Sequence, residues 1–339
     1  MRSFSLGIRP ASVRAALCAF TIAAASLSAQ QPVKTGYVLV ANQQSSSATI
    51  VDVATRATTT VEVGAGPHEA VISPDGKWGV VTIYGVSGAA GAGNKLAIID
   101  LGAKRVVRTI DLGSYTRPHG ASFVPGKPSH VVVTSETTQN VVLVDIAEGR
   151  VLNAIPTRHP VSHMLGVTAD GRRAFTASIS YGGISEIDLE KQAFVRDLAV
   201  STTTEGVGVA PDGSTVWLGS NDANSVSIID TKTWQVVATI GGLDMPYRIG
   251  FSPDGRTVVF CDPRANKVWI ADAATRKLVG SVDGLGSPRG VKIAGDNRTA
   301  FVTLGADNAV ASIDLVDRKV NWTVPVGASP DGVWYGPVP

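Results

Sequence analysis

The chain contains seven copies of one sequence unit, and this repeat limits the folds that it can adopt. The segment IVDVAT at residues 50–55 recurs as IIDLGA, LVDIAE, EIDLEK, IIDTKT, IADAAT and SIDLVD. Each copy has one aspartate at the same place, and these are Asp52, Asp100, Asp145, Asp188, Asp230, Asp272 and Asp314. The intervals between them are 48, 45, 43, 42, 42 and 42 residues. Units of this length fill residues 37–336, so the sequence predicts one repeat domain and no second domain.

Each unit contains four short segments with alternating apolar residues, separated by turns. Residues 247–282, for example, contain YRIGFS, TVVFCD, KVWIAD and KLVGSV, with a PDG turn after the first segment. Alternation of this kind between Asp-Gly turns is typical of antiparallel hairpins. Four antiparallel strands in each of seven units predict an all-β fold, the seven-bladed β-propeller.

The two ends of the repeat region predict how the ring closes. Residues 37–41 match the second strand of a unit, and residues 329–336 match a first strand with nothing after it. We therefore expect the last blade to combine three N-terminal strands with one C-terminal strand, which pairs edges that would otherwise be exposed. Residues 30–36 are then a short linker, and residues 337–339 are a short tail.

The unit resembles the repeat of a known family. The segment PYRIGFSPDGRTVVFCDPRANKVWIADAATRKLVGSV is similar to the YVTN repeat of bacterial and archaeal surface or periplasmic propellers. The resemblance covers residues 37–336 and implies the same fold. Members of that family are surface, binding or scaffold proteins, and related propellers carry haem or copper or act as lactonases. Resemblance of fold does not select among these functions.

The first 29 residues have the composition of an export signal. Arg2, Arg9 and Arg14 precede the apolar run AALCAFTIAAA, and small residues follow it up to Ala29. This order is typical of a secretory signal peptide, and the apolar run is shorter than the roughly 20 residues that a membrane span needs. We predict a signal peptide at 1–29, cleavage near Ala29, and a periplasmic or secreted protein that does not span a membrane.

Removal of this segment changes the charge balance. The whole chain has 30 Lys and Arg against 28 Asp and Glu, a net charge of +2. Without the three arginines the balance is 27 to 28, or −1. The near-neutral remainder has no basic stripe, so nucleic acid is not an expected partner. We expect a monomer that binds a small polar ligand or a protein partner.

The seven repeat aspartates indicate a structural need of the unit. They come at the end of the third strand, directly before a tight turn. An Asp side chain at such a place can accept backbone N–H groups and fix the turn. We interpret them as turn residues rather than as seven separate carboxylate sites.

The first residues of the innermost strands differ among the copies and indicate function. In chain order they are His68, His119, His163, Glu205, Tyr247, Arg289 and Asp331. Innermost strands surround the axis of a propeller, so these residues should ring one mouth of its channel. Three of the five histidines of the chain are among them, although only 17% of all residues are charged. The next position is Gly in four copies, and Glu69, Met164 and Arg248 depart from it.

The histidines at this mouth offer a metal site. His68, His119 and His163, with Glu205 as a fourth ligand, supply N, N, N and O donors that suit Zn²⁺, Cu²⁺ or Fe²⁺. The alternative is that a Pro-His pair suits the turn into an inner strand and that the rings bind channel water. A divalent transition metal is therefore one hypothesis for the cofactor.

The same mouth offers a site for an anion. Arg248 and Arg289 can hold a carboxylate or a phosphate, with Tyr247 beside them. Loops of this face, including the insertion at 84–95, bring Arg117 toward the mouth. The alternative is that the arginines pair with the mouth carboxylates, which are Glu69, Glu205 and Asp331.

An enzyme is the rival hypothesis. A lactonase-like hydrolase or an oxidoreductase would use the same mouth, with a metal-activated water or with Glu205 as a base. The sequence contains no Gly-x-Ser-x-Gly elbow and no Cys-x-x-Cys-His haem motif. We interpret Cys261, in a predicted strand, as a buried apolar residue rather than a nucleophile. The sequence therefore favours a binding module for a small polar ligand, a metal or a protein partner.

Overall fold

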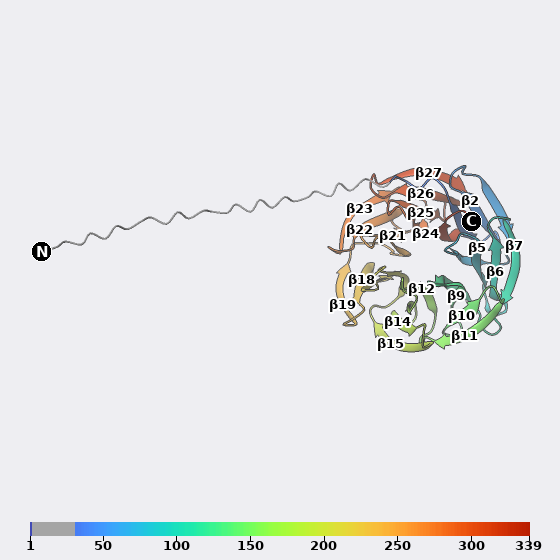
Figure 1. Ribbon diagram of the computed structural model, residues 1–339, viewed down its shortest axis with the longest axis horizontal. Helices are drawn as coiled ribbons and strands as arrows, with labels where there is room; N and C mark the ends of the chain where they lie inside the picture. The colour runs from blue at the N-terminus through green and yellow to red at the C-terminus, as the bar shows by residue number, and fades with distance from the viewer. Residues whose placement is uncertain (2–30) are drawn as a thin grey trace.

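Seven four-stranded antiparallel sheets surround a central axis as blades (Figure 1). The computed structural model describes Met1 and residues 31–339. Apart from Met1, the predicted signal peptide and its cleavage point near Ala29 lie outside the described residues. The all-β propeller with seven blades of four strands is confirmed.

The strands of each blade follow one another from the channel to the outside. The innermost strands are β4 (Pro67–Ile72), β8 (Pro118–Val124), β12 (Ser162–Val167), β16 (Thr204–Val209), β20 (Ile249–Phe251), β24 (Pro288–Ile293) and β28 (Pro330–Gly336). The second strands are β5 (Trp78–Gly85), β9 (Lys127–Ser135), β13 (Arg173–Ser178), β17 (Thr215–Ser220), β21 (Thr257–Asp262), β25 (Thr299–Leu304) and β1 (Tyr37–Asn42). The third strands are β6 (Ala92–Asp100), β10 (Asn140–Asp145), β14 (Gly183–Asp188), β18 (Ser225–Asp230), β22 (Lys267–Asp272), β26 (Ala309–Asp314) and β2 (Ser47–Asp52). The outermost strands are β7 (Arg105–Asp111), β11 (Arg150–Pro156), β15 (Ala193–Ala199), β19 (Gln235–Ile240), β23 (Lys277–Asp283), β27 (Lys319–Pro325) and β3 (Thr58–Glu62).

The insertion at 84–95 contains a short 3₁₀ helix, η1 (Ala89–Gly91), between β5 and β6. The strand pairing of β5 and β6 extends to its base, where Gly85 lies opposite Ala92. Within the described part of the chain, no helix is long and apolar enough to cross a membrane.

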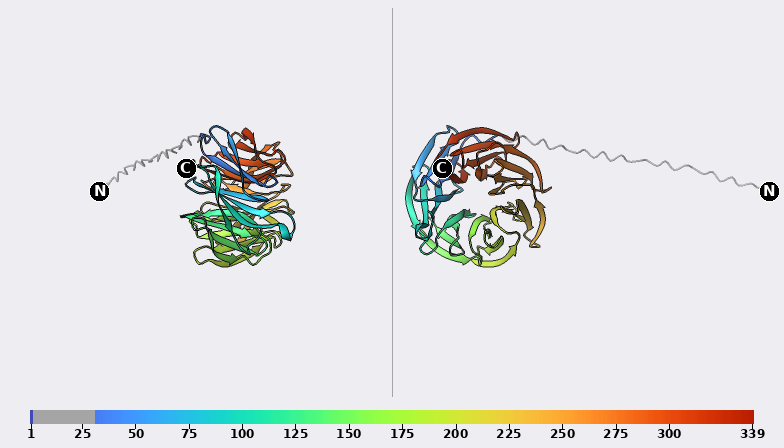
Figure 2. Two further views of the ribbon diagram at one scale, coloured as in Figure 1. Left: turned by 90° about the vertical axis from the view of Figure 1, so that its right-hand side faces the viewer. Right: turned by 180° about the vertical axis from the view of Figure 1, so that it is seen from behind.

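The two ends of the chain share one blade. β28 pairs with β1, from Gly336 opposite Tyr37 to Pro330 opposite Asn42. β2 and β3 complete this sheet, so it combines three N-terminal strands with one C-terminal strand, as predicted. Figure 2 shows the blue start and the red end of the described chain side by side in the ring.

The core lies between neighbouring blades. Leu39 and Ile50 of the shared blade pack against Val81 and Ile99 of the following blade, and all four side chains are fully buried. Both faces of a middle strand are covered in this way, whereas an outer strand such as β7 leaves most of its residues exposed or half-buried. Cys261 is fully buried, and burial raises the pKa of its thiol, which confirms its interpretation as a core residue.

The repeat aspartates fix the turns between the third and outermost strands. Asp52 Oδ1 accepts the N–H groups of Ala54 and Thr55, both at 2.9 Å. The side chains of the other six accept at least one N–H group each in the same turn. The residue four places after each aspartate has a φ between 51° and 76°, and only one of the seven, Gly149, is a glycine. A positive φ is unfavourable for the six of these residues that are not glycine, so hydrogen bonds to the aspartate stabilise the turn. The structural interpretation of the aspartates is thereby confirmed.

Candidate functional site

A bulge at the start of the innermost strands positions the mouth residues. The pairing of β4 with β5 runs from Pro67 opposite Ile83 to Ala70 opposite Val81, so His68 and Glu69 share one partner position. The same shift occurs in β8, β12, β16 and β24. Bulges re-aim side chains next to functional sites. Because of the bulge in β4, the consecutive side chains of His68 and Glu69 can enter the same polar network.

The glycines at the second position of the bulge admit the neighbouring innermost strand. A Cβ atom on Gly206 would lie 1.9 Å from the carbonyl oxygen of Tyr247, and one on Gly290 would lie 2.2 Å from that of Asp331. Such contacts leave no space for a side chain. Glu69 and Arg248 stand at this position in two other blades, and both join the network of the mouth.

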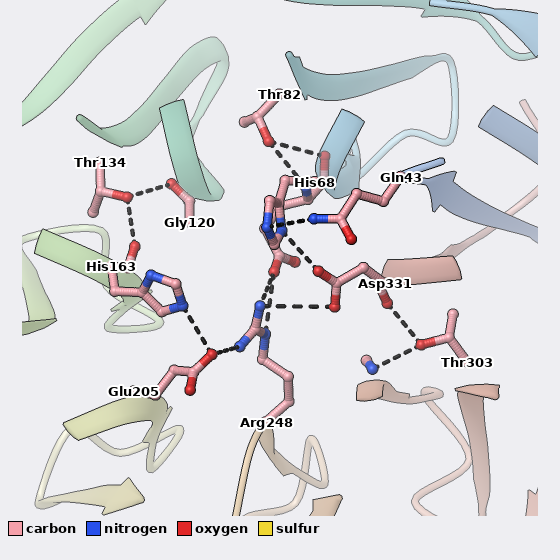
Figure 3. A network of polar contacts seen from close by, with 12 residues as sticks. Gln43, His68, Thr82, Gly120, Thr134, His163, Glu205, Arg248, Thr303 and Asp331 are labelled. Atoms are coloured by element: carbon pink, nitrogen blue, oxygen red, sulfur yellow. Dashed lines mark hydrogen bonds and ion pairs between the residues drawn. The ribbon is translucent and has the colours of Figure 1, made fainter. Parts of the chain in front are cut away.

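His163 lies between two carboxylates. Its Nε2 lies 3.0 Å from Glu205 Oε1, as Figure 3 shows, and its Nδ1 hydrogen-bonds Glu136 Oε1. Tyr84 donates to the other oxygen of Glu136 at 2.6 Å. Burial disfavours the charged ring, but the hydrogen bonds to Glu136 and Glu205 raise the pKa of His163 above its usual value. The protonated ring, which donates through both nitrogens, is therefore favoured.

The guanidinium of Arg248 joins carboxylates from three blades (Figure 3). Its Nη2 donates to Glu69 Oε1 at 2.8 Å, and its Nη1 donates to Glu205 Oε1 at 3.1 Å. Nη2 also lies 3.8 Å from Asp331 Oδ1, and the side chain is only 5% exposed. Burial acts to raise the pKa of Glu205, but His163, Arg248 and the amide of Asn221 bring it down to about 2. Arg248 is therefore a buried cross-link of the ring.

A carboxylate orients His68. Its Nδ1 lies 2.7 Å from Asp331 Oδ2, and its Nε2 lies 3.0 Å from the side-chain amide nitrogen of Gln43. Burial disfavours the ionised form of Asp331, but His68 and Arg248 lower its pKa below the usual value. In its neutral form, a ring that donates its Nδ1 proton to this carboxylate would present the lone pair of Nε2 toward Gln43.

His119 has no polar partner in the described part of the chain. Its ring lies between those of His68 and His163, with centroid distances of 4.0 Å and 3.7 Å. The side chain is fully buried, and neither ring nitrogen has a hydrogen-bond partner among the described residues. Burial, and then the neighbouring cations, keep the pKa of His119 well below its usual value, so the ring is neutral. Leaving a buried polar group unpaired costs about 1–3 kcal/mol.

The mouth has more buried carboxylates than buried cations. Four acidic side chains there are buried, and they are Glu69, Glu136, Glu205 and Asp331. They face one buried arginine, Arg248, and the rings of His163 and His68, so the carboxylates outnumber these three groups. Burial, and then the charge of Asp331, raise the pKa of Glu69 against the attraction of Arg248 and His68. The site therefore favours an additional cation.

Two sets of possible metal ligands converge on His119. One set is His68, Glu69 and His119, and the other is His119, Glu136 and His163. In each set the candidate ligand atoms lie within 4.8 Å of one another, and all three residues are buried. The three histidines predicted as ligands are thus brought together, whereas Glu205 belongs to neither set and instead pairs with His163 and Arg248.

The residues predicted to hold an anion lie in different places. Tyr247 and Arg289 line a cavity of about 370 Å³ together with His68 and Asp331. Arg289 donates to Ser329 Oγ at 2.9 Å and forms no ion pair with any described residue. Arg117 instead stacks on the ring of Tyr84 and donates to the carbonyl oxygen of Gly88 at 2.7 Å. Arg117 therefore holds the insertion at 84–95, and its side chain reaches the mouth network through the ring of Tyr84.

Sequence reasoning missed three partners of the mouth residues, which are Gln43, Glu136 and Asn221. Each directly follows the end of a second strand, β1, β9 or β17. Connections from second to third strands lie on the mouth face, so position in the repeat is the signal that would have found them. No shared residue type marks these positions, because the copies differ there.

Comparisons with known proteins support the fold but no family. No family model and no curated protein matches the chain. Among solved structures the chain is similar to hydrazine synthase from Kuenenia stuttgartiensis, with a TM-score of 0.69 and 15% sequence identity. That alignment covers 89% of this chain and 98% of the other. At this identity the likeness shows the propeller fold alone, and membership of the YVTN-repeat family stays a prediction.

Proposed function

We propose that this protein is a binding propeller whose channel mouth holds a divalent transition-metal ion, with His119 as the central ligand. The state of His119 carries the proposal, because the ring is buried, neutral and without a polar partner among the described residues. A neutral imidazole with an available lone pair is the form that binds Zn²⁺ or Cu²⁺. A bound ion would satisfy this ring.

The charge of the mouth supports a cation rather than a water molecule as the partner. The four buried carboxylates outnumber Arg248 and the rings of His163 and His68 that pair with them. Water would satisfy a hydrogen bond of His119 but would leave that excess negative charge in place. A divalent ion would coordinate His119 and would also balance the excess negative charge.

The set formed by His68, Glu69 and His119 fits a metal better than the set that contains His163. Both ring nitrogens of His163 are held by carboxylates, so this residue would have to lose a strong hydrogen bond. His68 has the arrangement typical of a metal ligand, with a carboxylate on Nδ1 and a lone pair on Nε2. The amide of Gln43 lies in front of that lone pair, and the end of this half-buried, flexible side chain can turn aside.

The test is metal content and affinity of the exported protein. The purified protein is stripped with a chelator, offered Zn²⁺ and Cu²⁺ separately, and examined by elemental analysis and calorimetry. We expect one equivalent of bound metal in the native chain. The variant His119→Phe, which keeps a buried ring but no ligand atom, should lower metal affinity by at least about a hundredfold.

A matched control is His130→Gln. His130 lies 3.6 Å from the turn aspartate Asp145 and belongs to neither ligand set, so this variant should bind metal as the native chain does. Absence of binding by the native chain, or equal affinity in the His119→Phe variant, would refute the metal proposal.

A small anionic ligand is a second candidate, favoured by Arg289. Its guanidinium lines the 370 Å³ cavity beside His68 without an acidic partner among the described residues. An anion in this cavity would bond Arg289 and would also lie beside the ion proposed at His68. Titration with inorganic phosphate tests this candidate, and the variant Arg289→Met should abolish the heat of binding that the native chain gives.

A further inference from the structure

A second cavity lies in the channel below the mouth network. It has a volume of about 440 Å³ and is lined by innermost strands from all seven blades. Its walls are mainly apolar, with Val71, Leu165, Phe251 and Trp334 among them. Glu69 and Arg248, which are bonded to each other at 2.8 Å, form its boundary toward the mouth. We call it the lower channel cavity.

One lysine is the single charge in this cavity that no other described residue balances. Apart from the bonded pair Glu69 and Arg248, Lys292 on β24 is the one charged residue of the lining. It forms no ion pair with any described residue, and its Nζ lies 3.8 Å from the centre of the Trp334 ring. Burial lowers the pKa of Lys292 to about 8, so the ammonium form still prevails at neutral pH.

The repeat does not require a lysine at this place. The matching positions of the other innermost strands, found from their pairing with the second strands, are Val71, Ser122, Gly166, Gly208, Gly250 and Trp334. All six are uncharged. The fold therefore does not need a charge at this position, since six copies of the unit lack one. A charged group facing an apolar cavity also lowers the stability of the protein, so a bound ligand explains Lys292 better than packing does.

Stacking on tryptophan alone does not explain Lys292. Three lysines of the described chain stack in this way, and they are Lys77 on Trp78, Lys267 on Trp269 and Lys292 on Trp334. Lys77 is exposed to solvent, and Lys267 lies 3.2 Å from the carboxylate of Asp283. Lys292 alone combines the stack with a position in a cavity and the lack of a carboxylate partner among the described residues.

We propose that the lower channel cavity binds a small carboxylate with an apolar body, whose charged end pairs with Lys292. The apolar walls would cover the body of such a ligand, and the ring of Trp334 would hold the ammonium group in line with its carboxylate. A dianion is disfavoured, because the cavity offers one unbalanced positive charge and Glu69 stands at its upper boundary. This site and the proposed metal site share one residue, Glu69, and Lys292 belongs to neither ligand set.

The first test compares hexanoate with hexanol by calorimetry on the native exported protein. Hexanoate should bind with one site per chain, and hexanol, which has the same body without the charge, should bind at least about tenfold more weakly. The variant Lys292→Met keeps the length of the side chain and should lower hexanoate affinity at least about tenfold without changing that for hexanol. Its metal content should equal that of the native chain, which shows that the mouth is intact.

The second test uses the native chain only, so it does not depend on the folding of a variant. Acetic anhydride acetylates amines that it can reach, including a half-buried lysine such as Lys292 at a lower rate, and mass spectrometry measures the rate at each lysine. Hexanoate should slow acetylation of Lys292 and leave the matched surface residue Lys77 unchanged, while hexanol protects neither. Equal binding of hexanoate and hexanol, no effect of Lys292→Met, or no protection of Lys292 would overturn the proposal.

Discussion

The turns and the channel mouth of this propeller are both built from equivalent positions of the seven repeat units, but the residue is the same in every copy at the turns and differs among the copies at the mouth. Seven aspartates occupy equivalent turns, and each accepts N–H groups from its own turn. Seven residues occupy equivalent starts of innermost strands, and several of them contact a residue of the neighbouring blade, as His68 does with Asp331. A position that serves its own unit stays constant among the copies. A position that faces the other units is free to differ, and there the copies build one site together.

Removal of the closing strand should have the largest effect, because it deletes a mouth residue together with its support. A chain that ends at residue 328 loses β28, including Asp331 and the pairing with β1. We expect a loss comparable to the whole stability of a typical domain, about 5–15 kcal/mol. Thermal unfolding followed by circular dichroism measures it. A melting temperature equal to that of the full chain would show that closure by β28 contributes little.

Loss of the central cation should have the next largest effect. In the variant Arg248→Met the carboxylates of Glu69 and Glu205 lose their buried partner, so we expect a decrease of about 3–5 kcal/mol in the free energy of unfolding. Denaturation in urea measures the change. The control Arg150→Met removes an exposed pair with Glu148 and should cost no more than about 1 kcal/mol. Similar losses in both variants would contradict the contrast between mouth and surface.

Loss of a single turn aspartate should have a small and local effect. The variant Asp52→Ala removes the acceptor of two N–H groups, so we expect a decrease of about 0.5–1.5 kcal/mol and unchanged metal affinity. The variant Asp52→Asn keeps an acceptor oxygen and should lose less. A change in metal affinity in either variant would show that turn and mouth are coupled.

Acid should weaken several of the turns at once. Hydrogen bonds from backbone N–H groups lower the pKa of the turn aspartates, such as Asp52 and Asp188, below the usual value of 3.8. Their stabilising contribution is therefore complete above about pH 4 and is lost as pH falls through the lower values of the folded state. Melting temperatures between pH 5 and pH 2.5 should fall less steeply when several turn aspartates are replaced by Asn. Identical slopes would refute this role.

The propeller architecture could be predicted from the sequence more completely than the side-chain contacts at its mouth. The turn aspartates and the PDG turns repeat with the unit, and the matching ends of the chain indicated the shared blade. The ring positions of His68, His119 and His163 followed from the repeat as well. The partner of His163 did not, because Glu136 belongs to the neighbouring blade and its distance in the chain carries no signal. Lys292 was missed for a similar reason, since only its contact with the next blade distinguishes it from a strand residue that faces solvent.

The place of Asp331 on the closing strand connects the assembly of the ring with its chemistry. β28 follows the other strands of the ring in the chain and supplies the carboxylate that orients His68, so a molecule in which β28 is not paired with β1 lacks this part of the mouth. An ion bound at His68 would favour the form in which β28 is paired with β1, by mass action. A chain cut before residue 330 would lack both this pairing and Asp331. Pairing of β28 with β1 therefore closes the propeller and completes the proposed metal site in the same step.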